Sequence, residues 1–191
     1  HCPRRQHAPR FATSMKTTLT YGFVLALAGF VLSLIFYVAG FHSSAEKLES
    51  ISVLTNCLLV VISVVVLYLA MNARRTATPA DQPWGYGSAF GTGVMTALFA
   101  ALFGLVLTYI YFAFINTNMS EIIYQAQVAK METKGLSADQ IEKAEPMMRK
   151  MMTPIAAAIV GSVVGFIFNF IFSLLVAIFV RSRPVATPPP V

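Results

Sequence analysis

Four long apolar stretches dominate the chain, and short polar segments separate them. Within the 191 residues, no Asp, Glu, Lys or Arg occurs over residues 17–45, 50–73, 82–120 and 151–180. A helix of about 20 apolar residues crosses a bilayer, and each of these stretches is longer. If these stretches are helical, apolar side chains lie on all sides of each helix and not along one stripe. This pattern argues against a soluble protein with a buried helical core. The pattern predicts an all-α integral membrane protein with a four-transmembrane-helix bundle.

The predicted domain boundaries follow from these stretches. The transmembrane spans are expected at about 19–41, 51–71, 88–115 and 155–180. Residues 1–14 are interpreted as a disordered tail or a non-native extension, because the segment from Met15 is typical of a bacterial start. The transmembrane domain then covers residues 15–183. The Pro-rich residues 184–191 cannot form a helix and are predicted to be an extended tail.

The polar stretch between the third and fourth spans, residues 118–152, predicts an amphipathic helical hairpin. Ser137 and Gln140 have the spacing of a capping box, which starts a helix. Acid-before-base pairs four residues apart follow on one helix face, at Asp139–Lys143 and Glu145–Arg149, and such pairs stabilise helices. We expect this hairpin at the extracytoplasmic membrane interface, with its charged face in water.

Four methionines crowd the end of this hairpin, at Met147, Met148, Met151 and Met152. Thioethers are ligands for Cu(I), but no Cys or His accompanies them, so no metal site is predicted. An apolar helix face that docks on the protein's own helices explains them more simply. Met-rich surfaces also adapt to varied partners, so the four residues remain a candidate interaction face for lipid or protein.

Charge is scarce and confined to the ends of the apolar stretches. Only 12% of residues are charged, against about 25% in soluble domains. The net charge of +6 lies beside the predicted spans, which favours contact with anionic lipid headgroups rather than nucleic acid. Arg74 and Arg75 after the second span, together with the basic residues near both termini, follow the positive-inside rule. We therefore expect a multi-pass protein of the bacterial inner membrane with both termini in the cytoplasm.

Small residues recur at regular spacings in the first, third and fourth predicted helices. In the fourth span the row has a four-residue step and includes Gly161, Gly165, Asn169 and Ser173. The third span contains Gly91, Gly93 and Gly104, and the first contains Gly29. Helices in lipid associate by close packing at such residues, so we predict helix contacts there. Packing within one chain is preferred, with a homo-oligomer as the alternative.

Polar chemistry inside the spans is limited to uncharged side chains. Asn169 needs hydrogen-bond partners at its depth, and Asn56, Ser63 and Thr108 are candidates by residue type. Ion-coupled carriers usually need charged groups in their spans, and intramembrane proteases need a nucleophile–base pair, a pair of acids or a metal. We therefore predict no catalytic residue, no metal and no cofactor, and no enzymatic activity.

Four short motifs occur in a fixed order: YGSAFGTG from Tyr86, TYIYFAFINTN from Thr108, GLSADQIEKA from Gly135 and MMTP from Met151. In this order and spacing the chain resembles an uncharacterised bacterial family, domain of unknown function 4199. The resemblance covers about residues 15–183. It implies a four-helix inner-membrane protein and supplies no catalytic residue.

Two classes of function follow. The first is a non-enzymatic membrane protein that acts through helix packing and through contact with lipid or a partner protein. The alternative is a small transporter or channel subunit formed by oligomerisation. A polar path lined by Asn56, Ser63, Thr108 and Asn169 would favour the alternative, whereas a dry bundle would favour the first class.

Overall fold

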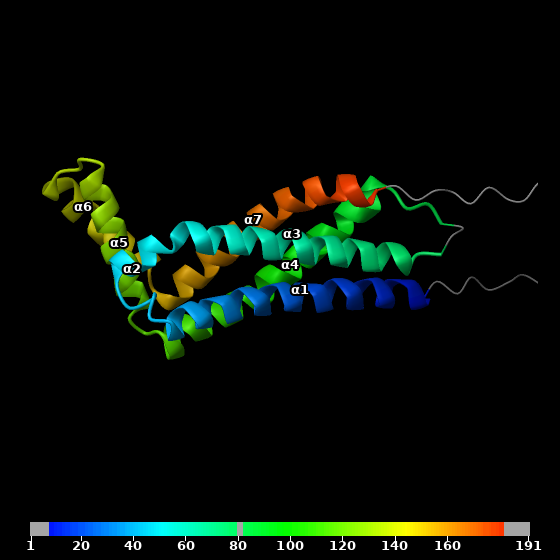
Figure 1. Ribbon diagram of the computed structural model, residues 1–191, viewed down its shortest axis with the longest axis horizontal. Helices are drawn as coiled ribbons and strands as arrows, with labels where there is room; N and C mark the ends of the chain where they lie inside the picture. Colours follow the sequence, from blue (N-terminus) through cyan, green and yellow to red (C-terminus); the bar gives the residue numbers. More distant parts are fainter. Residues whose placement is uncertain (1–7, 80–81, 182–191) are drawn as a thin grey trace, which may run out of the picture.

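The computed structural model describes residues 8–79 and 82–181, and side chains are described from residue 15 onward. Four long helices form a bundle (Figure 1). They are α1 (Ala8–Val38), α3 (Ser52–Thr76), α4 (Tyr86–Ile110) and α7 (Pro154–Val180). The shorter elements are α2 (Ala45–Ser50), the π-helical turn η1 (Tyr111–Ile115), α5 (Met119–Thr133) and α6 (Ala138–Met151).

Each long helix contains a segment long and apolar enough to span a membrane, at Met15–Val38, Ser52–Thr76, Tyr86–Ile115 and Pro154–Val180. Large apolar side chains cover much of the outer surface of these helices, as lipid contact requires. The predicted four-span helical membrane fold is confirmed. Helical structure begins at Ala8, inside the segment expected to be a disordered tail, whereas the predicted tail 184–191 lies outside the described residues.

The long helices alternate in direction, so the connections gather at two ends. The start of α1, the α3–α4 connection and the end of α7 lie together at one end, here called the terminal end (Figure 1). The α1–α3 connection with α2, and the hairpin of α5 and α6, lie at the opposite end, here called the hairpin end (Figure 1). This arrangement matches a chain that crosses a membrane four times.

The best-packed part of the bundle lies toward the terminal end. α4 packs most extensively against α7 and α1, and it also contacts α3. Residues of α3, α4 and α7 and the segment before α4 form the core here: Leu67, Met71, Trp84, Ala89, Val176, Ala177 and Val180. The indole Nε1 of Trp84 donates a hydrogen bond to the carbonyl oxygen of Val180 over 3.0 Å, which ties the start of α4 to the end of α7.

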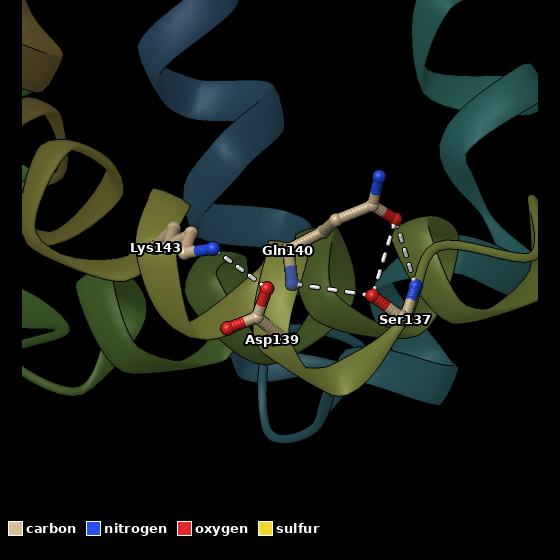
Figure 2. A network of polar contacts seen from close by, with 4 residues as sticks. All are labelled: Ser137, Asp139, Gln140 and Lys143. Carbon is tan, nitrogen blue, oxygen red and sulfur yellow. Dashed lines mark hydrogen bonds and ion pairs between the residues drawn. The ribbon is translucent and has the colours of Figure 1, made fainter.

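The predicted helical hairpin is present as α5 and α6. The Ser137 hydroxyl oxygen accepts from the backbone N–H of Gln140, and the Gln140 side chain accepts from the backbone N–H of Ser137 (Figure 2). Lys143 Nζ lies 2.7 Å from Asp139 Oδ2 on the next turn (Figure 2). The capping box and the first predicted ion pair are therefore confirmed.

Arg149 connects the two helices of the hairpin. Its guanidinium contacts Glu145 Oε1 at 2.6 Å on α6 and Glu121 Oε2 at 3.1 Å on α5, and it lies 4.2 Å from the ring centre of Tyr124. Hydrogen bonding to Arg149 lowers the pKa of Glu145 below its usual value. A further ion pair of 2.7 Å joins Lys130 of α5 to Glu49 of α2. These contacts join the two helices of the hairpin to each other and join the hairpin to the α1–α3 connection.

Candidate functional site in an intramembrane cavity

Close helix contacts occur at two glycines of the bundle. A Cβ added to Gly93 would lie 2.6 Å from Ser173 Oγ and 2.8 Å from Ser173 Cβ, so α4 and α7 meet there without room for a side chain. A Cβ added to Gly22 would lie 2.6 Å from Phe99 Cβ, which gives the same result for α1 and α4. Small residues at these positions let the helix backbones approach, as expected in a membrane.

The close contact predicted at Gly161 and Gly165 is absent. An added Cβ at either position meets no described atom within 4 Å, and the same is true of Gly91 and Gly104. At Gly29 it would make only ordinary contact, 3.7 Å from Leu59. The reason is geometric, because a four-residue step advances about 400° and the row drifts around the helix. Ser173 at one end of the row is fully buried, while the two glycines border a hollow.

This hollow is a cavity of about 300 Å³ in the half of the bundle nearer the hairpin end. All four long helices contribute to its wall. The residues that α7 contributes include Gly161, Ser162, Gly165 and Asn169. Most of the lining is apolar. The polar side chains that line it are Ser33, His42, Ser63, Thr108, Tyr111, Ser162 and Asn169. None of the described residues that line the cavity is Asp, Glu, Lys or Arg.

Two buried polar atoms at this cavity have no partner among the described residues, Asn169 Oδ1 and Ser162 Oγ. The Asn169 amide nitrogen donates to the carbonyl oxygen of Gly165 in its own helix, over 2.8 Å. The predicted hydrogen bonds from Asn169 to another helix are therefore absent. Ser63 and Thr108 do line the same cavity, but Asn56 is exposed on the outside of α3. A buried acceptor without a donor costs about 1–3 kcal/mol unless water or a ligand satisfies it.

A cluster of buried polar side chains lies at the hairpin end of the cavity. His42 Nδ1 is 2.5 Å from the Tyr111 hydroxyl. The Asn116 amide nitrogen donates to the His42 carbonyl oxygen over 3.2 Å and lies 3.4 Å from the Tyr111 hydroxyl. His42, Tyr111 and Asn116 are 7%, 4% and 5% exposed. Burial lowers the pKa of His42 below its usual value, so its ring is neutral at pH 7.

The π-helical turn η1 makes this cluster. The backbone N–H of Asn116 donates to the carbonyl oxygen of Tyr111 over 2.8 Å, one residue further than in an α-helix. The turn ends α4 and aims Tyr111 inward toward the first connection, where His42 lies. The sequence analysis did not predict the contact between His42 and Tyr111. A hydrogen-bond register that widens by one residue leaves no periodic signal in the sequence, so this cluster was not found.

The methionines of the hairpin do not form one buried face. Met147 is 70% exposed and Met151 is 47% exposed, whereas Met148 and Met152 are partly covered. No residue of α6 is buried. In residues 8–79 and 82–181 no group of three or more His, Cys, Asp or Glu side chains has the arrangement of a metal site.

Comparison with known proteins identifies one family. The family model described as "Protein of unknown function (DUF4199)" matches residues 20–182, a range that includes most of the first span, the other three spans and the hairpin. No curated protein and no solved structure matches the chain. Because the matched region covers most of the chain, the protein belongs to the DUF4199 family.

Proposed function

We propose that this protein is a non-enzymatic membrane protein that binds a small uncharged molecule in its intramembrane cavity. The observation that carries this proposal is the pair of unpartnered polar atoms, Asn169 Oδ1 and Ser162 Oγ, on the wall of an otherwise mainly apolar hollow. Ligand sites combine such an apolar lining with a few directed polar groups.

The chemistry of the wall defines the class of ligand. Asn169 Oδ1 accepts a hydrogen bond, and the Ser162 hydroxyl both donates and accepts one. Because the described residues that line the cavity include no charged side chain, a ligand with a full charge would lack a counterion from them in a medium of low dielectric constant. A neutral amphipathic molecule with a hydroxyl or amide N–H group fits these conditions. A volume of about 300 Å³ suits a small molecule and excludes a whole phospholipid.

The position of the cavity favours binding over an open channel. Fully buried side chains, including Leu67, Met71, Thr96 and Ser173, fill the bundle nearer the terminal end. A continuous path would require these side chains to separate. Transport by an oligomer is therefore the less favoured proposal, although Ser63, Thr108 and Asn169 do share one cavity.

A cavity-filling variant tests the proposal. Gly165→Leu places a side chain in the hollow without contact to another helix at its Cβ, so the fold should persist while the ligand is excluded. Val163→Leu is the matched control, because Val163 is 53% exposed on the outside of α7. Both variants and the unmodified protein would be purified from the same cells, extracted with organic solvent and analysed by mass spectrometry.

We expect a neutral small molecule to accompany the unmodified protein and the Val163→Leu variant, and to be absent from Gly165→Leu. Ser162→Ala and Asn169→Leu should lower its occupancy. A water-filled cavity, with identical extracts from all variants, would refute the proposal.

The hairpin supports a second candidate function, contact with a lipid surface or a partner protein. Met147 and Met151 are exposed on α6 at the far end of the molecule (Figure 1). A photo-crosslinking amino acid that replaces Met147 should capture that contact. The same amino acid in place of Lys143, on the charged face, should not. Equal crosslinking from both positions would contradict a specific methionine contact.

A further inference from the structure

A second cavity lies at the terminal end of the bundle and carries an arginine in its wall. Its volume is about 420 Å³, and it is formed by α1, the end of α3 and the first turns of α4. Unlike the intramembrane cavity, it has a polar lining. Arg74 is accompanied there by Thr18, Thr78, Gln82, Ser88 and Thr92.

Arg74 has no carboxylate partner among the described residues. The ion pairs among the described residues all join residues of α2, α5 and α6, which lie at the hairpin end. The described residues that line the cavity include no Asp or Glu, and the nearest acid in the sequence, Asp81, lies outside the described residues. Arg74 is partly buried, and a guanidinium stays charged at any physiological pH. Among the described residues, no carboxylate balances the positive charge of Arg74.

The beginning of α4 adds hydrogen-bond donors to the same wall. Its N-cap is Gly85, which has no side chain to cap the helix, and Gly87 and Ser88 in the first turn line the cavity. The backbone N–H of Ser88 donates to the Gly85 carbonyl oxygen over 3.1 Å, so the N–H groups of the first turn that have no acceptor within the helix are those of Tyr86 and Gly87, and they carry partial positive charge. An anion that binds beside Arg74 could therefore also accept hydrogen bonds from the start of α4.

The cavity has free space beside the glycines of α4, and buried side chains form other parts of its wall. A Cβ added to Gly87 or Gly91 meets nothing within 4 Å, so these glycines widen the cavity. Thr18 and Thr92 are 3% and 6% exposed, and Trp84 is anchored to α7. The cavity also lies at the terminal end of the candidate spans, where lipid headgroups are expected. We propose that it binds a phosphate group, carried either by an anionic lipid or by a soluble phosphorylated molecule.

Neighbouring arginines provide a matched test. Arg74→Gln removes the guanidinium that lines the cavity, whereas Arg75→Gln removes the same charge from a residue that does not line it. Purified protein in detergent would be titrated with phosphatidylglycerol and, separately, with glycerol 3-phosphate, and bound species would be counted by native mass spectrometry. Arg74→Gln should weaken binding about tenfold or more, since a charge-assisted hydrogen bond is lost. Arg75→Gln should change it less than about twofold.

Two further variants separate binding from folding. Gly91→Leu fills the cavity without altering charge and should weaken binding as well, while Arg74→Lys keeps the charge and should retain part of it. Binding of phosphatidylglycerol alone identifies a lipid site, and binding of glycerol 3-phosphate with the same dependence on Arg74 identifies a soluble ligand. Equal effects of Arg74→Gln and Arg75→Gln, or binding of neither probe, would overturn the proposal.

Discussion

Gly93 and Gly165 are both glycines on helices that pack together, α4 and α7. The space beside Gly93 is filled by another helix, whereas the space beside Gly165 is empty. Gly93 of α4 touches Ser173, whereas Gly165 of α7 borders the intramembrane cavity. A sequence pattern reports that a residue is small, and it does not report whether the space beside it is filled. The substitution of each glycine therefore has a different expected cost.

Gly93→Leu should destabilise the bundle, because its Cβ would overlap Ser173 and force α4 and α7 apart. Overpacking of this kind costs about 1–3 kcal/mol of the free energy of unfolding. Gly165→Leu should change the melting temperature in detergent much less. Equal losses at both positions would mean that the cavity is not open to a side chain.

His42 is the residue whose protonation should matter. Asn116 donates toward the Tyr111 hydroxyl, and the hydroxyl proton is then directed to His42 Nδ1, which accepts only when the ring is neutral. The folded-state pKa of His42 is lowered, so the unfolded state binds more protons at mildly acidic pH. Its contribution to stability is complete above about pH 6.5 and is lost as the pH falls through the lowered pKa.

Thermal unfolding between pH 8 and pH 5 measures this effect. The unmodified protein should lose stability on acidification, and His42→Gln, which keeps an acceptor for Tyr111 but does not titrate, should show a flatter profile. Identical profiles for the two proteins would assign the pH dependence to other groups.

Among the elements, the hairpin was the most predictable and η1 the least. The capping box at Ser137 and the ion pairs within α6 can be predicted from the sequence, because their partners are three or four residues apart in one helix. The pairs that join different elements, such as Arg149 with Glu121, depend on how the helices meet and were not predicted. The same holds for the candidate site, in which sequence identified Asn169 by its residue type but not the cavity or the His42 cluster beside it.

Arg149→Ala should loosen the hairpin, because one guanidinium contacts Glu121, Glu145 and the Tyr124 ring. Amide hydrogen exchange of α5 and α6 should become faster, while exchange in the four spans stays the same. Lys143→Ala is the control, since it breaks only the exposed pair with Asp139 within α6. Similar exchange in the two variants would show that Arg149 does not join the helices.

For the whole molecule, the positions of the connections lead to a prediction of topology. Gln82 lies in the α3–α4 connection at the terminal end, and Lys134 lies in the hairpin at the other end. Arg74, Arg75 and Arg181 also lie at or near the terminal end, and by the positive-inside rule we predict that this end faces the cytoplasm. Reporter fusions at Gln82 and Arg181 should then be cytoplasmic and a fusion at Lys134 periplasmic. The reverse result would invert the orientation, and all three on one side would contradict four crossings.

Trp84 is the chain's single tryptophan, and its hydrogen bond to Val180 holds it at the terminal end. The tryptophan fluorescence of the protein therefore originates at one end of the molecule. Trp84 also lines the cavity that contains Arg74, so its emission wavelength should shift when that cavity is occupied. Movement of the hairpin, or filling of the intramembrane cavity, should leave the emission unchanged. The native protein thus contains an optical reporter that distinguishes events at its two ends without any added label.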